Sequence, residues 1–135
     1  MIFFMKKHLR VSAAVIEKDG KIFAAQRGNH GEMALKWEFP GGKIEPGETP
    51  EQALVREIKE ELDTTIEVVR PIVTIEHEYE TFSITLYAFL CHIVSGNLTI
   101  KEHLASQWLD KSQLQTLDWS GADEEIVKES SINNR

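Results

Sequence analysis

Three glutamates, Glu57, Glu60 and Glu61, follow one another at the spacing that places side chains on one face of a helix. At about 6 Å and an effective dielectric near 20, each pair repels by roughly 3 kcal/mol, which is more than an ordinary surface imposes. A cation is therefore expected among them. Because all the ligands would be oxygens, with no Cys or His at matching spacing, Mg²⁺ is favoured, Mn²⁺ is the alternative and Zn²⁺ is a poor candidate.

The helix that carries these acids has clear boundaries in the sequence. Thr49 is a good N-cap, Pro50 suits the first helical position, and Gln52 stands where a capping box needs it. The helix is therefore predicted to start near Pro50. Apolar side chains recur every four residues and form a stripe, which consists of Leu54, Ile58 and Leu62. Glu61 lies beside this stripe and the other two acids lie further round, so the acids are expected to line the edge of the core.

A segment rich in glycine and proline precedes the helix. Pro40-Gly41-Gly42 ends a strand-like stretch, and Pro46-Gly47 follows shortly after, so a loop is predicted here. Small residues allow backbone groups to approach a metal or a phosphate closely. A solvated acidic helix is the alternative explanation of the charges, but it gives no role to the loop with its paired glycines. Loop and helix are therefore interpreted as one site for pyrophosphate chemistry.

Together these residues resemble the signature of the Nudix hydrolase family, in which Gly, five residues, Glu and seven residues precede Arg-Glu-aliphatic-x-Glu-Glu. The chain has Gly42, Glu48 and Arg56-Glu57-Ile58-Lys59-Glu60-Glu61 at these places. It departs where Asp63 replaces a usual Gly and Thr64 a usual aliphatic residue. Since Asp tolerates the left-handed backbone of a helix end, we expect a modest stability cost and intact catalysis. The resemblance implies a Nudix fold, an α/β/α sandwich with a mixed sheet.

The stretch 37–53 is most similar to the MutT branch of this family. Members of that branch hydrolyse nucleoside triphosphates between the α and β phosphates and release a nucleoside monophosphate and pyrophosphate. The resemblance implies that Arg56 orients carboxylates, Glu48 among them, and that either Glu57 or Glu102 takes the proton of the attacking water. It also implies the metal ligands, which are the carbonyl of Gly41 and the carboxylates of Glu57, Glu60, Glu61 and Glu102.

Three further residues are expected at the substrate. Arg27 matches a position where MutT-like proteins direct an arginine to the phosphates, although an ordinary surface arginine is equally consistent. Phe39 is assigned to the substrate with a core role as its alternative. Asp123 matches the position from which MutT reads the base, and a helix N-cap is equally natural there. Phe82 replaces an arginine of MutT, which weakens strict 8-oxoguanine specificity and keeps CTP, dCTP and modified pyrimidine nucleotides as candidates.

The remaining sequence predicts strands and short helices around this site. A hairpin is predicted from strands 9–17 and 22–26, because Asp19-Gly20 is a strong turn signal between them. The elements expected after the acidic helix are strands 66–77, 82–94 and 106–109, a short helix over 111–117 and a terminal helix over 122–128. Residues 1–135 are expected to form a single domain, with fraying of the polar tail 129–135.

Composition limits the class of protein. A net charge of −7 argues against nucleic-acid polymers and polybasic membrane contacts, because the long-range force would have the wrong sign. The apolar residues 1–5 precede lysines, unlike a secretory signal, and Met5 is an alternative start to Met1. A single cysteine, Cys91, excludes an intramolecular disulfide, suits a reducing compartment and is expected in the core. We expect a cytoplasmic monomer or homodimer whose partner is a small nucleotide.

Two other functions stay open. Some Nudix proteins bind nucleotides without hydrolysing them, usually after losing acids of the signature, and here those acids are all present. The other is cleavage of a different diphosphate derivative such as ADP-ribose, for which the short chain has no obvious extra segment. The five histidines, His103 among them, show no ligand spacing and are expected in surface or core roles.

Overall fold

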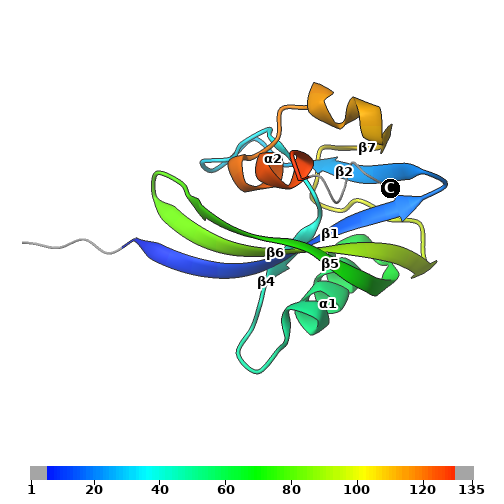
Figure 1. Ribbon diagram of the computed structural model, residues 1–135, viewed down its shortest axis with the longest axis horizontal. Helices are drawn as coiled ribbons and strands as arrows, with labels where there is room; N and C mark the ends of the chain where they lie inside the picture. The colour runs from blue at the N-terminus through cyan, green and yellow to red at the C-terminus, as the bar shows by residue number, and fades with distance from the viewer. Residues whose placement is uncertain (1–5, 130–135) are drawn as a thin grey trace, which may run out of the picture.

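The computed structural model describes residues 6–129 as a twisted sheet with helices on both sides (Figure 1). The elements in chain order are β1 (Lys7–Lys18), β2 (Lys21–Gln26), β3 (Trp37–Glu38), β4 (Gly41–Lys43), α1 (Pro50–Leu62), β5 (Thr65–Glu78), β6 (Phe82–Ser95), β7 (Ala105–Asp110), the 3₁₀ helix η1 (Lys111–Thr116) and α2 (Gly121–Val127). Every predicted helix and strand is present, with ends no more than two residues from the predicted ones. The predicted helix over 111–117 is a 3₁₀ helix.

Strand β1 organises the sheet because it pairs along both edges. Residues 7–16 of β1 run parallel to residues 82–91 of β6, while β4 and β2 pair antiparallel with successive parts of the other edge. Strand β5 pairs antiparallel with β6, and β7 with β2. The main path, β3-β2-β1-β6-β5, is therefore the mixed sheet that was predicted.

Two apolar layers cover opposite faces of the sheet, because successive side chains of a strand point to opposite sides. In β1, Ala13 and Val15 belong to the layer that includes Ile126 of α2, whereas Ala14 and Ile16 belong to the layer under α1. The predicted stripe of α1 is fully buried in that second layer and consists of Leu54, Ile58 and Leu62. The fold is an α/β/α sandwich, as predicted.

Local signals in the sequence produced the expected local structures. Asp19 and Gly20 adopt φ values of 52° and 78°, the left-handed pair that a tight hairpin turn needs. Thr49 and Gln52 form the capping box, with each side chain accepting a hydrogen bond from the other residue's backbone N–H. Asp63 ends α1 in the left-handed region with φ 51°, so its substitution for glycine is accommodated.

The expectation of an open loop at Pro40-Gly41-Gly42 is wrong in one respect. Gly41 and Gly42 belong to β4, where they lie opposite Ala13 and Ser12 of β1. A Cβ atom on Gly41 would lie 1.9 Å from the carbonyl oxygen of Ser12. Glycine is needed here because two backbones approach closely, which is a long-range contact that turn-like composition does not reveal.

The chain ends and the single cysteine bear on three smaller expectations. The choice of Met1 or Met5 as start lies outside the described residues, as does nearly all of the predicted frayed tail. Within residues 6–129, no helix is both long and apolar enough to cross a membrane. Cys91 is buried in β6, and burial raises the pKa of its thiol to about 12, in agreement with the expected core role.

Candidate active site

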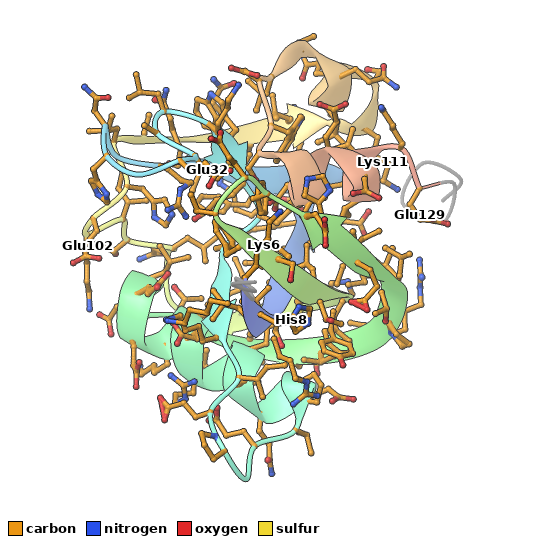
Figure 2. All side chains as sticks on the ribbon, turned by 90° about the vertical axis from the view of Figure 1, so that its left-hand side faces the viewer. Lys6, His8, Glu32, Glu102, Lys111 and Glu129 are labelled. Carbon is orange, nitrogen blue, oxygen red and sulfur yellow. The ribbon has the colours of Figure 1, made fainter. Side chains whose placement is uncertain are left out.

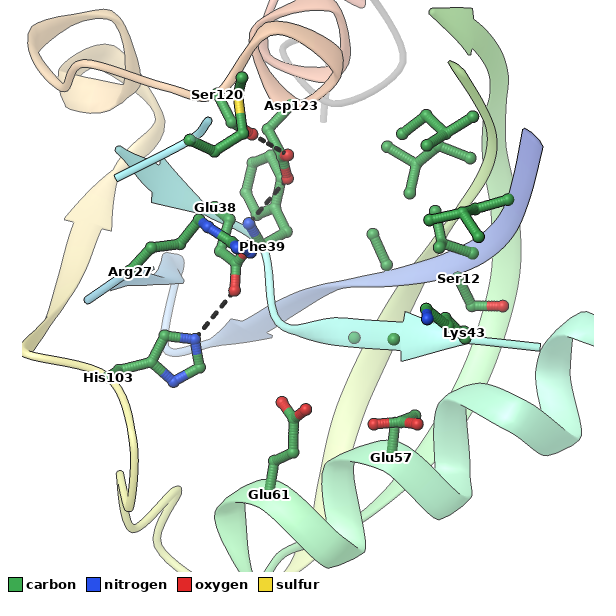
Figure 3. Close-up of a pocket in the computed structure, with 18 of the residues that line it drawn as sticks. Ser12, Arg27, Glu38, Phe39, Lys43, Glu57, Glu61, His103, Ser120 and Asp123 are labelled. Atoms are coloured by element: carbon green, nitrogen blue, oxygen red, sulfur yellow. Dashed lines mark hydrogen bonds and ion pairs between the residues drawn. The ribbon is translucent and has the colours of Figure 1, made fainter. Parts of the chain in front are cut away.

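The acidic helix and the predicted substrate residues share one cavity of about 850 Å³. Its acidic end is formed by α1 and the loop before β7, and its other end by apolar residues of β1 and β6 and the start of α2 (Figure 3). Arg56 alone among the predicted site residues is outside its lining. The predicted residues that line the cavity are Arg27, Phe39, Gly41, Glu57, Glu60, Glu61, Glu102 and Asp123.

Glu57 and Glu61 point from α1 into the cavity, one helical turn apart (Figure 3). Burial, and secondarily the charge and hydrogen bond of Glu57, raise the pKa of Glu61 to about 7. Gly42 of β4 leaves the space that this arrangement requires, since a Cβ atom there would lie 2.4 Å from the carboxyl carbon of Glu57. The two carboxyls are therefore held together at the inner edge of α1, where water does little to relieve their repulsion.

Arg56 holds the acidic helix from behind the cavity. Its Nε and Nη2 donate to the two carboxylate oxygens of Glu48 at 2.7 and 2.9 Å, and its Nη1 donates to Glu57 Oε1 at 2.9 Å. Nη2 also donates to the carbonyl oxygen of Lys43 at 3.0 Å, which ties α1 to β4. Hydrogen bonding to Arg56 lowers the pKa of Glu48 to about 2. The contact between Arg56 and Glu48 that the resemblance implied is present.

The register of β4 decides where the carbonyl of Gly41 points. Ala14 N donates to the carbonyl oxygen of Pro40 at 2.8 Å, so Pro40 is bonded to β1. In an antiparallel ladder such bonding alternates, and the backbone polar groups of Gly41 and Lys43 therefore point away from β1. The Lys43 carbonyl meets Arg56 of α1 on that side. The Gly41 carbonyl leaves β4 by the same edge, toward the acidic helix.

Glu60 and Glu102 lie at the exposed rim of the cavity. The Glu60 side chain is 60% exposed, and its Oε2 lies 3.3 Å from Arg56 Nη1. Lys101 Nζ donates to the Glu60 carbonyl oxygen at 3.0 Å, which fixes the loop of Glu102 beside α1, and Glu102 itself projects outward (Figure 2). In the part of the chain that the structure describes, no three acidic, His or Cys side chains already stand in a metal-binding arrangement. The structure thus joins Glu57 and Glu61 closely and leaves the other two acids at the rim.

The pair of Glu57 and Glu61 suits a hard divalent cation. Two neighbouring carboxylates with little access to water repel each other, and burial beside Glu57 raises the pKa of Glu61 to about 7. Arg56 neutralises Glu57 only from the side away from the cavity. Carboxylate and carbonyl oxygens are the ligands that Mg²⁺ and Mn²⁺ prefer. The residues present therefore fit such an ion on the cavity side.

Glu38 is a site residue that sequence reasoning missed, although it stands next to the paired glycines. Its Oε1 accepts a hydrogen bond from Arg27 Nη1 at 3.0 Å, and its Oε2 lies 2.9 Å from His103 Nε2 (Figure 3). The hydrogen bond to Glu38 raises the pKa of His103. The expectation of a surface or core role for His103 did not include the cavity, which its side chain lines while only 10% exposed. Arg27 lines the cavity with a side chain that is 37% exposed, and its buried Nε has no hydrogen-bond partner among the described residues.

Aromatic rings form the opposite end of the cavity. Phe39 stacks on Trp119 with ring centroids 4.6 Å apart and is only 3% exposed. Phe39 therefore has the core role that was named as its alternative, while it still lines the cavity. Tyr79 stacks on Phe82 with centroids 4.7 Å apart. Where the resemblance would place an arginine, Phe82 thus makes this end apolar rather than cationic.

Asp123 is the third residue of α2, so the predicted N-cap role is wrong. The helix begins at Gly121, and Ser120 is its N-cap. Asp123 Oδ1 accepts a hydrogen bond from the backbone N–H of Phe39 at 2.9 Å, and Oδ2 accepts one from the Ser120 hydroxyl at 2.5 Å. Burial raises the pKa of Asp123 to about 7. The side chain joins α2 to the segment between β3 and β4, and it also lines the cavity.

We expect Asp123→Asn to stabilise the protein above neutral pH. Because the pKa of Asp123 is about 7 in the folded state and near 3.8 in the unfolded state, the stability of the wild type falls as pH rises through this window. Asparagine retains an acceptor for Phe39 and places a donor beside the Ser120 oxygen without a buried charge. Urea unfolding should show near-equal stability at pH 4 and a gain of up to about 4 kcal/mol at pH 8. A variant less stable at pH 8 would show instead that the charged carboxylate is the favoured form.

Comparison with known proteins identifies the family. The family model for the NUDIX domain matches residues 11–129. The chain is 42% identical over 102 residues to the CTP pyrophosphohydrolase of Escherichia coli K12, and the aligned part covers 76% of each chain. It is 36% identical over 122 residues to the 8-oxo-dGTP diphosphatase of the same organism, covering 90% of this chain and 95% of the relative.

Solved structures of related proteins share the fold. The solution structure of the E. coli ORF135 protein is 36% identical, with a TM-score of 0.79 and coverage of 94% of this chain and 91% of that one. The MutT protein of methicillin-resistant Staphylococcus aureus 252, described as a Nudix hydrolase, is 40% identical with a TM-score of 0.75 and coverage of 92% and 95%. With the family match spanning most of the chain and the acidic cavity in place, the protein belongs to the Nudix hydrolase family.

Proposed function

We propose that this Nudix hydrolase cleaves a nucleoside triphosphate between its α and β phosphates and releases a nucleoside monophosphate and pyrophosphate. The observation that carries the proposal is that one cavity joins the acidic face of α1 to an aromatic end. A nucleotide has the matching parts, namely a polyphosphate that arrives with a cation and a base that suits apolar and aromatic walls. The names of the two E. coli relatives, which specify CTP and 8-oxo-dGTP, support this substrate class.

Mg²⁺ is the proposed cofactor, with Mn²⁺ as a substitute, in a family whose members generally use divalent metal ions. When bound, the ion supplies charge neutralisation at the phosphate oxygens and activation of water. The residues proposed to hold it are Glu57, Glu60, Glu61, Glu102 and the carbonyl of Gly41. The strongest support is the position of Glu61 beside Glu57, where burial, and secondarily the charge of Glu57, raise the pKa of Glu61 to about 7.

The other polar residues of the cavity position the phosphates and accept a proton. Arg56 fixes Glu57 through a 2.9 Å hydrogen bond, so this carboxylate keeps one orientation. Arg27 lines the cavity, and a hydrogen bond to Glu38 holds its guanidinium in place. This arrangement suits a guanidinium that contacts phosphate oxygens. The proton of the attacking water passes to Glu57 or Glu102. These two carboxylates are the candidates for the general base.

The aromatic end is proposed to hold the base. Tyr79 and Phe82 offer a stacked wall, and Phe39 offers a third ring in the lining of the cavity. Both oxygens of Asp123 already accept protein hydrogen bonds, so a base can use only the remaining acceptor positions of this carboxyl. Such positions suit an amino group, as on cytosine or guanine.

The test is an assay of product formation. The purified protein is incubated with Mg²⁺ and CTP, dCTP, 5-methyl-dCTP, dGTP, 8-oxo-dGTP, ADP-ribose or diadenosine polyphosphates, and monophosphate, pyrophosphate and orthophosphate are measured separately. We expect monophosphate and pyrophosphate in equal amounts from at least one triphosphate, and no turnover when EDTA exceeds the metal. Turnover confined to ADP-ribose or the dinucleotides, or release of orthophosphate from triphosphates, would contradict the proposal.

A further inference from the structure

One carboxylate joins two segments that are far apart in the sequence and meet at the aromatic end of the cavity. Glu32 lies in the connection between β2 and β3, and its side chain accepts three hydrogen bonds from the turn between β5 and β6. The donors are the backbone N–H of Glu80 at 2.7 Å, the backbone N–H of Thr81 at 3.1 Å and the Thr81 hydroxyl at 2.6 Å. We call this set of contacts the Glu32 tie.

Each segment joined by the tie contributes residues to the cavity. The connection between β2 and β3 contributes His30 and Met33, and the turn is flanked by Tyr79 and Phe82. The Tyr79 N–H donates to the Phe82 carbonyl oxygen at 2.8 Å, which closes the turn under their stacked rings. In Figure 1 the connection and the tip of the β5–β6 hairpin lie near each other at the same end of the sheet.

The chemistry of the tie suits a positioning role. The backbone N–H groups of Glu80 and Thr81 lie at the tip of a hairpin. The Glu32 carboxylate accepts from both, and these hydrogen bonds are charge-assisted. The Thr81 hydroxyl lowers the pKa of Glu32 most, and Lys6, which donates to the Tyr79 carbonyl oxygen at 2.7 Å, adds a smaller effect of the same sign. Glu32 and Lys6 both face the viewer in Figure 2. Because the tie is exposed, it adds little to global stability and acts mainly on the placement of the two segments.

We propose that Glu32 is a positioning residue for the base of the substrate, an inference that rests on the proposed function. By holding the connection against the hairpin turn, it positions His30 and Met33 relative to Tyr79 and Phe82 in the lining of the same cavity. The acidic part of the phosphate end is built by α1, β4 and the loop of Glu102, and the Arg27 guanidinium is held by Glu38 of β3, so these contacts do not run through Glu32. Loss of the tie therefore weakens binding of the base and leaves the chemical step at the phosphates unchanged.

Steady-state kinetics of Glu32→Ala test the inference, with the triphosphate that the wild type hydrolyses best. We expect KM to rise about 10-fold and the dissociation constant of the nucleoside monophosphate product to rise in parallel, with kcat within about 2-fold of wild type. Thr81→Val removes the hydroxyl and keeps the backbone N–H, so a smaller rise of about 3-fold in KM is expected. Thr81→Ser keeps the hydroxyl and is the matched control, with kinetics like the wild type.

Hydrogen exchange of the nucleotide-free protein supplies the second readout. Glu32→Ala should speed exchange in residues 28–36 and 79–82 and leave α1 as protected as in the wild type. Faster exchange with an unchanged KM would overturn the inference, because the tie would then be structural only. A fall in kcat with constant KM would overturn it as well. If the wild type neither binds nor hydrolyses any triphosphate, the proposed function fails first and the inference falls with it, so the two failures are distinguishable.

Discussion

Glu61→Gln is expected to abolish turnover while making the metal-free protein more stable. The pKa of Glu61 is about 7 in the folded state against 4.5 ordinarily, so the wild type loses stability as pH rises between these values. Glutamine removes the charge next to Glu57, and at pH 8 the gain should be on the order of 1–2 kcal/mol. Because an amide is a poor ligand for a hard cation, kcat should fall at least about 10³-fold.

Two measurements on Glu61→Gln separate these effects. Thermal unfolding at pH 8 in EDTA should give a higher Tm for the variant, and added Mg²⁺ should raise the Tm of the wild type more than that of the variant. Glu51→Gln, an exposed change in the first turn of the same helix, is the matched control and should keep its kcat. Near-normal turnover, or a lower Tm in EDTA, would refute the role given to Glu61.

Gly41→Ala should destabilise the fold by more than about 3 kcal/mol. The added Cβ atom would lie 1.9 Å from the carbonyl oxygen of Ser12 and 2.9 Å from its carbonyl carbon, and both are backbone atoms that cannot move alone. Relief of the clash requires separation of β4 from β1, with which β4 pairs at three positions. The separation would also displace the Gly41 carbonyl from the acidic helix, so activity should fall with stability.

Gly42→Ala provides the contrast for Gly41→Ala at the neighbouring position. Its Cβ atom would meet the side chain of Glu57, which, unlike backbone, can move aside at the cost of its 2.9 Å hydrogen bond to Arg56. We therefore expect a stability change within about 1 kcal/mol but a large loss of kcat. Urea unfolding and steady-state kinetics of both variants check the pair. Small, equal losses of stability would show that the register of β1 and β4 adjusts to an added methyl group.

The helix and its acids could be predicted because their determinants are neighbours in the chain. The Thr49 capping box, the Asp63 helix end and the three spaced glutamates depend on contacts within about one helical turn. The same holds for the Asp19-Gly20 turn, whose left-handed backbone angles follow from the residues themselves. Local conformational preference was enough to place these elements within two residues.

Other parts of the site depended on contacts that span the chain. Glu38 meets His103 across 65 positions, and only the pairing of β3 and β7 with β2 brings the two together. A histidine without ligand spacing has no signal of such a partner in its own neighbourhood. For Asp123 the residue type suited both an N-cap and a cavity role, and the decision came from the helix start at Gly121 and the hydrogen bond to Phe39, 84 residues away.

The acidic helix and the family signature could be predicted from the order of residues alone, because they depend on local periodicity, caps and one continuous stretch. The mixed sheet between helices was implied by the family resemblance. The tertiary structure decided which acids are inner and which lie at the rim, where the Gly41 carbonyl points, and how Glu32 closes the aromatic end. The physical reason is that burial, ladder register and charge pairing depend on what packs opposite each residue, and here the opposing residues lie tens of positions away.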